Sequence, residues 1–192
     1  MSLRERNRRN TLTVTQRTAV EMFVANGFDE VKVVDIAAEV GLATSTLYRY
    51  FPTKEAIVVW DDHGDAYAEA LGSALAEHPP FAALREAFVR SFAGLYDTDR
   101  EFQLARVRLI YRIPAIHAAA VEADVADRQY LSELLRQHLR SADRDAAVLL
   151  AGAASLAADW AFDRWQESGG DTPLASLVAT AFDRLGHLDD LS

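Results

Sequence analysis

Side chains that can hydrogen-bond DNA are concentrated in one short stretch, from Thr44 to Tyr50. Six of its seven residues carry a hydroxyl or a guanidinium group, and the seventh is a leucine. Such groups donate hydrogen bonds to phosphate oxygens, and a guanidinium can also bind O6 and N7 of a guanine with two hydrogen bonds. Because an α-helix fits the major groove, the stretch indicates DNA contact if it folds as a helix.

The residues around this stretch predict two short helices that cross at a tight turn, over residues 35–51. Their apolar positions supply a small core, formed by Ile36, Val40, Leu42, Leu47 and Phe51. Ala37 lets the two helices approach closely, and Gly41 permits the chain reversal between them. A helix-glycine-helix pattern is common on its own, so a similar hairpin in an unrelated helical protein stays open as the alternative.

Further motifs extend this pattern, namely Gly27-Phe28, Asp35-Ile36-Ala37, Gly41-Leu42-Ala43, Thr46-Leu47-Tyr48-Arg49-Tyr50-Phe51 and Lys54-Glu55. With these motifs, residues 13–60 closely resemble the tetracycline-repressor (TetR) family. The resemblance implies a helix-turn-helix that binds DNA and a helical domain that binds an effector and dimerises. Two cap positions differ from the usual pattern, since Lys32 stands where the family usually has Thr and Ala43 where it has Ser. We expect Thr44 to cap the recognition helix in place of Ala43.

The N-terminal part of a recognition helix reaches deepest into the groove, which makes Thr44, Ser45 and Arg49 the candidates for base contacts. Capping or turn formation is the alternative for the first two, and a solvated side chain for the arginine. The resemblance and the helix starts imply phosphate contacts by a second group, namely Lys32, Thr46, Tyr48, Tyr50 and Lys54. Packing of a buried ring is the alternative for either tyrosine. The arginines at positions 8 and 9 form either a mobile arm for the minor groove or a solubilising tail.

The periodicity of the apolar residues predicts an all-α chain of about nine helices. The expected helices cover residues 13–27, 34–40, 44–51, 52–75, 81–96, 102–112, 115–140, 146–166 and 173–185. The long fourth helix joins two predicted domains. Residues 1–60 are the DNA-binding domain with its three-helix helix-turn-helix, and residues 61–192 are the effector-binding and dimerisation domain.

Charge is unevenly distributed along the 192 residues, whose net charge is −9. Residues 1–60 carry eight Lys and Arg against seven acids, whereas the rest carries 12 against 22, so only the first segment lacks an acidic excess that repels DNA. The chain has no cysteine, and no apolar run follows its basic start. We therefore expect no thiolate chemistry and no secretory signal, and place the protein in the cytoplasm. The apolar stretch 146–158 is too short for a membrane span, which needs about 20 residues.

The rest of the chain offers an aromatic-rich set of side chains for a largely apolar effector. The set comprises Phe92, Tyr96, Phe102, Arg106, Tyr111, His117, Trp160 and Trp165. Packing in the core is the alternative for each of them. Residues 106–116 and the later helix with two tryptophans are similar to the C-terminal domain of mycofactocin-regulator-type members of the family. That resemblance implies an acyl-CoA or another hydrophobic acyl ligand, with Arg106, Arg108 or Arg112 near its phosphates.

Two apolar stripes are candidates for a homodimer interface. They comprise Leu150, Ala154, Ala158, Leu174, Leu177, Val178, Ala181 and Leu185. A palindromic operator presents two half-sites about 34–36 Å apart, so we expect a homodimer with two recognition helices. Packing within one subunit is the alternative for at least part of each stripe.

The sequence lacks the signatures of an enzyme, since it contains no glycine-rich phosphate loop, nucleophile elbow or metal-ligand pattern. Asp61 and Asp65 share a helix face, but His63 points elsewhere, so we interpret residues 61–65 as a solvated face. No cofactor and no metal are expected. The sequence therefore predicts a transcriptional regulator, most simply a repressor that a small hydrophobic ligand releases from its operator. A ligand-independent regulator or an activator with a vestigial pocket is the alternative.

Overall fold

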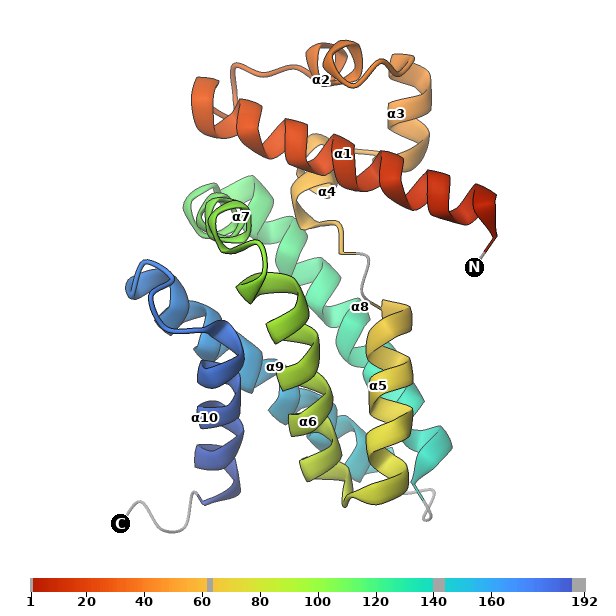
Figure 1. Cartoon of the computed structure of the whole chain (residues 1–192), viewed down its shortest axis with the longest axis vertical. Coiled ribbons are helices and arrows are strands. Elements are labelled where there is room, and N and C mark those ends of the chain that lie inside the picture. Colours follow the sequence, from red (N-terminus) through yellow and green to blue (C-terminus); the bar gives the residue numbers. More distant parts are fainter. Residues whose placement is uncertain (1, 62–63, 140–143, 188–192) are drawn as a thin grey trace. The chain divides into compact units, whose positions relative to one another are not determined.

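Helices form all the regular structure in the part of the chain that the computed structural model describes, residues 2–61, 64–139 and 144–187. Ten α-helices and one π-helix occur in these ranges, and no strand does (Figure 1). The prediction of an all-α protein is confirmed.

The described residues group by their contacts into two compact units. The first unit holds α1 (Leu3–Asn26), α2 (Val33–Glu39), α3 (Thr44–Tyr50) and α4 (Lys54–Val59), together with residues 105–121. The second unit holds α5 (Gly64–Glu77), α6 (Pro80–Phe92), the π-helix η1 (Ala93–Asp97), α9 (Arg144–Glu167) and α10 (Leu174–Gly186). Two helices contribute to both units, namely α7 (Arg100–Arg112) and α8 (Pro114–His138). Residues 105–121 thus group with the first unit, although in sequence they follow residue 60, the predicted domain boundary.

The first helix begins at Leu3, well before the start predicted at Thr13. A capping box explains the extra turns. The Ser2 hydroxyl accepts a hydrogen bond from the Glu5 backbone N–H at 3.2 Å, and the Glu5 carboxylate accepts one from the Ser2 N–H at 2.7 Å. The prediction of an arm or tail at residues 8–9 is wrong, because both arginines lie within α1.

A small apolar core holds the short helices of the first unit on α1. Its most deeply buried members include Ala19, Val20, Phe23, Ile36, Leu47, Phe51 and Ile57. Of the five core residues predicted from the helix-turn-helix pattern, Val40 and Leu42 are only half-buried. Gly41 reverses the chain where predicted, and Gly27 ends α1. Their φ angles are 69° and 90°, a conformation that strains residues with a Cβ.

The long fourth helix predicted over residues 52–75 is wrong, because the chain leaves the helix at Trp60, whose ψ is 130°. The Trp60 carbonyl accepts hydrogen bonds from Gln16 Nε2 at 2.7 Å and from Arg106 Nη1 at 3.0 Å. Gln16 Nε2 also donates to the carbonyls of residues 57 and 58, at 3.0 Å and 3.2 Å. Side-chain donors thus satisfy the carbonyls at the end of α4, which in a longer helix would bind backbone N–H groups.

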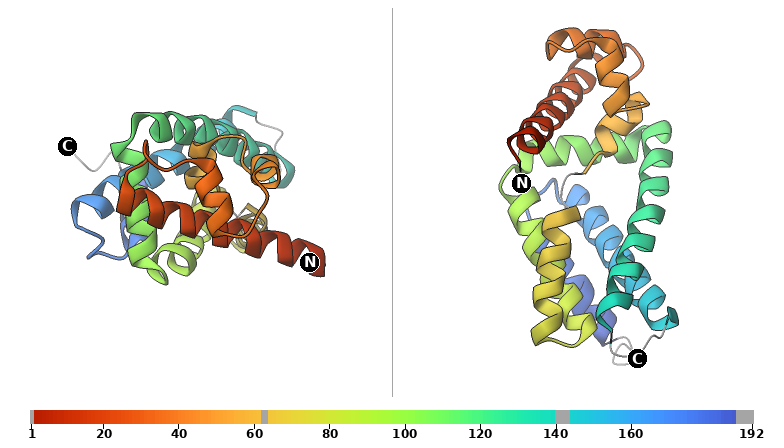
Figure 2. Two further views of the ribbon diagram at one scale, coloured as in Figure 1. Left: turned by 90° about the horizontal axis from the view of Figure 1, so that it is seen from above. Right: turned by 90° about the vertical axis from the view of Figure 1, so that its right-hand side faces the viewer.

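In the second unit, α6 contacts α5, α9 and α10, and α9 also packs on α10. Figures 1 and 2 show α5 and α6 side by side and antiparallel. Small residues line the buried face of α9 and allow close packing, namely Ala147, Ala151, Ala154, Ala157 and Ala161. The Asp97 carboxylate in η1 accepts a hydrogen bond from the Leu174 N–H at 2.9 Å, which caps α10 from a neighbouring element.

One helix of the described residues, α9, is long and apolar enough by length and composition to cross a membrane, from Asp145 to Glu167 at a mean hydropathy of 1.3. Its alanine face is buried inside the second unit. Because the core helix of a helical protein meets the same criterion, this composition gives little support for a membrane segment.

Candidate functional site

The third helix, α3, exposes half of its six polar side chains and leaves the other half partly buried. Leu47 is fully buried and fixes the helix to the core, whereas Ser45, Tyr48 and Arg49 are exposed. Ser45 and Arg49 lie one turn apart, so their side chains are neighbours on the outer face. Thr46 is half-buried. The structure therefore leaves two of the three base-contact candidates accessible on one face.

The caps of the helix starts near this face differ from those expected. The expectation that Thr44 caps α3 is wrong, because Ala43 occupies the cap position and Thr44, half-buried, is the first helical residue. At α2, the Asp35 carboxylate accepts a hydrogen bond from the Lys32 backbone N–H at 3.2 Å. The side chain of Lys32 is exposed at this helix start, where amide N–H groups and an ammonium suit an anion.

Lys54, predicted to contact a phosphate, is bound within the first unit. Its Nζ donates hydrogen bonds to the carbonyls of Phe28 at 2.5 Å and Val31 at 3.1 Å, and lies 4.1 Å from the centre of the Phe28 ring. An ammonium has three N–H donors, so one is left for a phosphate. No sequence pattern indicated these bonds, because they join residues 26 and 23 positions apart. Thr53 caps α4 and accepts a hydrogen bond from the Ala56 N–H at 3.1 Å.

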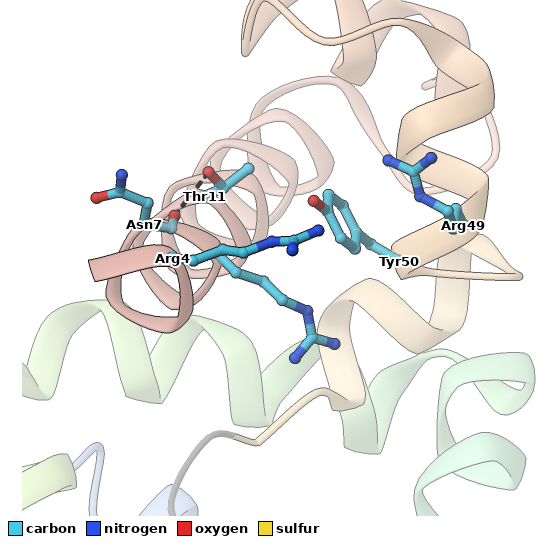
Figure 3. A pocket seen from close by; sticks show the side chains of 6 residues that line it. Arg4, Asn7, Thr11, Arg49 and Tyr50 are labelled. Atoms are coloured by element: carbon cyan, nitrogen blue, oxygen red, sulfur yellow. Dashed lines mark hydrogen bonds between the residues drawn. The ribbon is translucent and has the colours of Figure 1, made fainter. Parts of the chain in front are cut away.

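A pocket of about 640 Å³ opens between α1 and α3. Its lining is polar and basic, and comprises Arg4, Asn7, Arg8, Thr11, Arg49 and Tyr50. The Tyr50 ring is near two guanidinium groups, with its centre 5.9 Å from the central carbon of Arg8 and 5.6 Å from that of Arg49. Figure 3 shows side chains of α1 on one side of the pocket and Tyr50 and Arg49 of α3 on the other. Tyr50 is thus a phosphate-contact candidate in strongly cationic surroundings.

Three of the eight predicted effector residues meet in the second unit. The ring centres of Phe92 and Tyr96 are 5.4 Å apart, and those of Tyr96 and Trp165 are 5.8 Å apart. Sequence reasoning missed three further rings that extend this cluster by edge-to-face packing, namely Tyr67, Phe88 and Phe162. We call these six rings the aromatic ladder. Phe88 precedes Phe92 by one helical turn, so its spacing was a signal that could have identified it.

Three buried polar atoms of the second unit make no hydrogen bond within the described residues. They are Tyr67 Oη, Gln103 Oε1 and Trp165 Nε1. Burial raises the pKa of the Tyr67 hydroxyl, which therefore stays protonated. An unpaired buried polar atom costs about 1–3 kcal/mol, which a ligand with a matching donor or acceptor can recover.

The other five predicted effector residues lie outside the aromatic ladder, and they are Phe102, Trp160, Arg106, Tyr111 and His117. Trp160 lies 5.2 Å from the guanidinium of Arg184. Arg106, Tyr111 and His117 belong to the first unit, where Arg106 binds the Trp60 carbonyl. The rings of Tyr111 and His117 are 6.0 Å apart, and both side chains are exposed. The predicted set is therefore divided between the two units.

Four of the eight residues predicted for a dimer interface are buried inside the subunit, and they are Ala154, Leu174, Val178 and Ala181. The other four are half-buried, and they are Leu150, Ala158, Leu177 and Leu185. The large apolar side chains that α9 exposes are instead Val148, Leu149 and Leu156, with 59%, 72% and 57% of their surface accessible. The stripes of the sequence identified apolar residues but did not separate the inward face of α9 from the outward one.

The described residues contain no group of three or more His, Asp or Glu side chains that could hold a metal ion. Within the acidic run at residues 61–65, positions 62 and 63 lie outside the described residues. In the second unit, burial and the carboxylate of Asp124 raise the pKa of Asp159, while Arg128 lowers it.

Comparison with protein families finds two matches. Residues 17–59 match the family model described as bacterial regulatory proteins, tetR family. Residues 78–188 match the MftR C-terminal domain, and this match covers more than half of the 192 residues.

Similar proteins are transcriptional regulators and not enzymes. The protein assigned as the mycofactocin biosynthesis transcriptional regulator MftR of Mycobacterium tuberculosis is 27% identical over 177 residues, which cover 88% of this chain and 85% of the relative. The HTH-type transcriptional regulator TcmR of Streptomyces glaucescens is 31% identical over 124 residues, which cover 60% of this chain and 54% of the relative. The solved structure of the TetR-family repressor FadR from Thermus thermophilus, in complex with lauroyl-CoA, has a TM-score of 0.57 at 24% identity. It covers 94% of this chain and 95% of its own, and shares the fold.

Proposed function

Because the chain belongs to the TetR family of bacterial regulatory proteins, we propose that it is a repressor that holds an operator until a small hydrophobic ligand binds its second unit. The match to the MftR C-terminal domain over residues 78–188 carries this proposal, since the matched segment contains five of the six rings of the aromatic ladder. DNA binding is the common activity of the family, and ligand binding to the second unit is proposed to regulate it.

The exposed face of α3 supports base contacts by Ser45 and Arg49, with Thr44 beside them at the helix start. A guanidinium in this position can bind O6 and N7 of a guanine. We assign phosphate contacts to the residues around this face, namely Lys32, Thr46, Tyr48, Tyr50 and Lys54. Lys54 brings only its third N–H to a phosphate, because the other two hold the loop between α1 and α2.

The aromatic ladder suits an acyl chain or another apolar body of the ligand. The unpaired atoms Tyr67 Oη, Gln103 Oε1 and Trp165 Nε1 suit a polar group on that body, such as a carbonyl or a hydroxyl. An acyl-CoA combines an apolar chain with a thioester carbonyl. The lauroyl-CoA complex of the Thermus thermophilus FadR, which shares the fold, supports this class of ligand.

A homodimer in the cytoplasm completes the proposal, because a palindromic operator presents two half-sites. Exposed apolar side chains are costly in water, so Val148, Leu149 and Leu156 on α9 are the first candidates for the interface. The half-buried members of the predicted stripes adjoin it, namely Leu150, Ala158, Leu177 and Leu185.

Release from DNA requires that the ligand binds the DNA-free conformation more tightly than the DNA-bound one. A difference of about 1–3 kcal/mol is typical of such coupling, and it weakens DNA binding by about 5-fold to 150-fold. A ligand with equal affinity for both conformations leaves DNA binding unchanged, however tightly it binds.

Gel-shift assays on the DNA upstream of the protein's own gene test this function. We expect a shifted band with the wild-type protein, and its loss on addition of lauroyl-CoA but not of coenzyme A alone. Arg49→Ala is expected to reduce the preference for this DNA over a mixed-sequence duplex. A shifted band that lauroyl-CoA leaves intact contradicts the acyl-CoA effector and favours a ligand-independent regulator. Equal binding to upstream DNA and to the mixed-sequence duplex contradicts autoregulation through that DNA.

A further inference from the structure

The N-terminal turns of α1 form a basic segment that precedes the match to the TetR family, which begins at residue 17. Residues 3–12 carry four arginines and one glutamate. They are helical as part of α1 and belong to the first unit. The segment therefore has a defined position relative to α3, and its positive charge contrasts with the net charge of −9 for the chain.

Four side chains of this segment line one pocket, and they are Arg4, Asn7, Arg8 and Thr11. Their spacing of three and four residues places them in one stripe along α1. Arg49 and Tyr50 at the end of α3 complete the pocket, whose volume is about 640 Å³ (Figure 3). The Thr11 hydroxyl donates to the Asn7 carbonyl at 2.9 Å. The cationic donors that the pocket offers to a ligand are therefore its guanidinium groups.

Three guanidinium groups share this pocket, from Arg4, Arg8 and Arg49, and none of them pairs with a carboxylate of the described residues. Like charges at short range repel, and an anion among them replaces this repulsion by attraction. The planar fork of a guanidinium matches the oxygens of a phosphate. The Tyr50 ring gives the guanidinium groups of Arg8 and Arg49 a common aromatic neighbour within 6 Å. The pocket thus has the charge and the donors that a phosphate group requires.

We infer that the pocket between the N-terminal turns of α1 and the end of α3 binds a phosphate of the DNA backbone through Arg4 and Arg8, which leaves Arg49 for its base contact. Two of its residues, Arg49 and Tyr50, belong to the recognition helix, so a phosphate held there lies beside the groove that α3 enters. Contacts to phosphates carry no base preference, so the α1 segment raises the affinity for any duplex. This inference rests on the DNA binding through α3 proposed above.

The test compares Arg8→Gln with Arg6→Gln. Both substitutions remove one positive charge from the same turns of α1, but only Arg8 lines the pocket. Fluorescence anisotropy measures binding of a mixed-sequence duplex between about 50 and 200 mM KCl. Each lost phosphate contact makes the negative slope of log affinity against log salt shallower by about 0.9, so in a dimer we expect Arg8→Gln to make it shallower by about 2. Arg6→Gln should leave the slope unchanged, and circular dichroism should show equal helix content in both variants.

Three results overturn the inference. If Arg8→Gln keeps the salt slope of the wild-type protein, or if both variants change this slope equally, the pocket does not bind a phosphate. The proposed DNA binding through α3 is unaffected by either result. A wild-type protein that binds no duplex overturns the proposed function as well. Titration with inorganic phosphate distinguishes a DNA phosphate from a free anion as the ligand of the pocket. If the wild-type protein binds inorganic phosphate saturably, Arg8→Gln abolishes this binding and the salt slope of DNA binding is unchanged, the pocket binds a small phosphorylated ligand instead.

Discussion

The two units are stabilised by different kinds of contact. In the first unit, three side chains donate hydrogen bonds to main-chain carbonyls of residues distant in sequence, namely Gln16, Lys54 and Arg106. In the second unit, the six rings of the aromatic ladder pack edge to face, and three buried polar atoms have no hydrogen-bond partner in the described residues. Among the described residues, the second unit has fewer bonds of the first kind, such as that from Arg100 Nη1 to the Gly170 carbonyl at 3.1 Å.

Helix length explains this difference. The helices α2, α3 and α4 have only seven, seven and six residues, which is too short for stability on their own. Side chains from other elements therefore satisfy their free carbonyls and the loops between them. The helices α6 and α9 have 13 and 24 residues and bury apolar faces against each other and against α10. We therefore expect the loss of one polar group to destabilise the first unit and to leave the second nearly unchanged.

Gln16→Leu is expected to have the largest effect. The buried amide of Gln16 donates to the carbonyls of residues 57, 58 and 60, and leucine offers no donor. Because each unsatisfied buried group costs about 1–3 kcal/mol, the free energy of unfolding should fall by about 2–4 kcal/mol. Urea denaturation followed by circular dichroism measures the change.

Glu21→Gln is the control for this variant, because Glu21 is exposed on the same helix. Its effect should stay within about 0.5 kcal/mol. A similarly small effect of Gln16→Leu would show that the end of α4 needs no polar contact, and the contrast between the units would fail.

Lys54→Met tests the second polar contact of the first unit. Methionine keeps an apolar stem but removes the ammonium that binds the carbonyls of Phe28 and Val31. Hydrogen bonds to charged groups contribute about 1.5–3 kcal/mol, so the free energy of unfolding should fall by about that amount. Because the third N–H is proposed to contact a phosphate, Lys54→Met should also make the slope of log DNA affinity against log salt shallower by about 2 in a dimer.

Lys32→Met is the matched control, because Lys32 is exposed and loses the same charge. Lys32→Met should make the salt slope of DNA binding shallower without changing the free energy of unfolding. Unchanged stability in Lys54→Met would mean that the two carbonyl bonds contribute nothing, and an unchanged slope would remove Lys54 from the phosphate contacts.

Much of the first unit could be predicted because its functional side chains are exposed on short helices that follow a local motif. The polar face of α3 and the chain reversal at Gly41 were both visible in the sequence. The contacts that hold this unit were not, because bonds such as that from Arg106 to the Trp60 carbonyl join distant residues without any periodic pattern. The early start of α1 is different, since the Ser2 and Glu5 capping box was a local signal that was overlooked.

In the second unit, helix positions could be predicted but the direction of each face could not. Apolar periodicity marks a stripe, yet Ala154 and Leu156 lie two positions apart on α9 and one is buried while the other is 57% exposed. The aromatic residues showed the same difficulty. Of the predicted effector residues, Phe92 and Tyr96 lie together in the ladder, whereas Trp160 lies beside Arg184. Which residues converge depends on packing between helices, which a single sequence does not encode locally.

Tyr67→Phe tests the second unit and should raise the free energy of unfolding at neutral pH by about 1 kcal/mol. The substitution removes a buried hydroxyl that has no partner in the described residues and keeps the ring that packs on Phe88. Tyr130→Phe is the control, because Tyr130 is exposed and its loss of a hydroxyl should change nothing. A loss of more than about 1 kcal/mol in Tyr67→Phe would show a structural hydrogen bond and weaken the contrast.

The same variant has a defined pH dependence. Burial raises the pKa of Tyr67, so the folded state keeps its proton at a pH where the unfolded chain, with a pKa of about 10, loses it. The stability of the wild-type protein should therefore fall as the pH rises above about 10, by at most about 1.4 kcal/mol per pH unit from this residue. Tyr67→Phe should lack this part of the decline in urea denaturation at high pH.

Asp183→Asn should have the smallest effect, because it breaks an ion pair at the surface of the second unit. Arg85 Nε and Nη2 donate to the two carboxylate oxygens of Asp183 at 2.8 Å and 3.1 Å and connect α6 with α10. Exposed pairs contribute about 0.2–1 kcal/mol, so we expect a loss within that range at pH 7. Asp171→Asn is the control, because this carboxylate is 86% exposed and lies 3.7 Å from Arg100.

The pH dependence of this loss identifies the carboxylate as its source. The hydrogen bonds from Arg85 lower the pKa of Asp183, so the folded state binds the proton less tightly than the unfolded chain, whose Asp pKa is about 3.9. The stability from this pair is present above that pKa and is lost as the pH falls through the folded-state pKa. The wild-type protein and Asp183→Asn should therefore converge towards about pH 3. A loss at pH 7 as large as that of Gln16→Leu would show that polar contacts stabilise both units equally, and the difference in helix length would no longer explain how each unit is held.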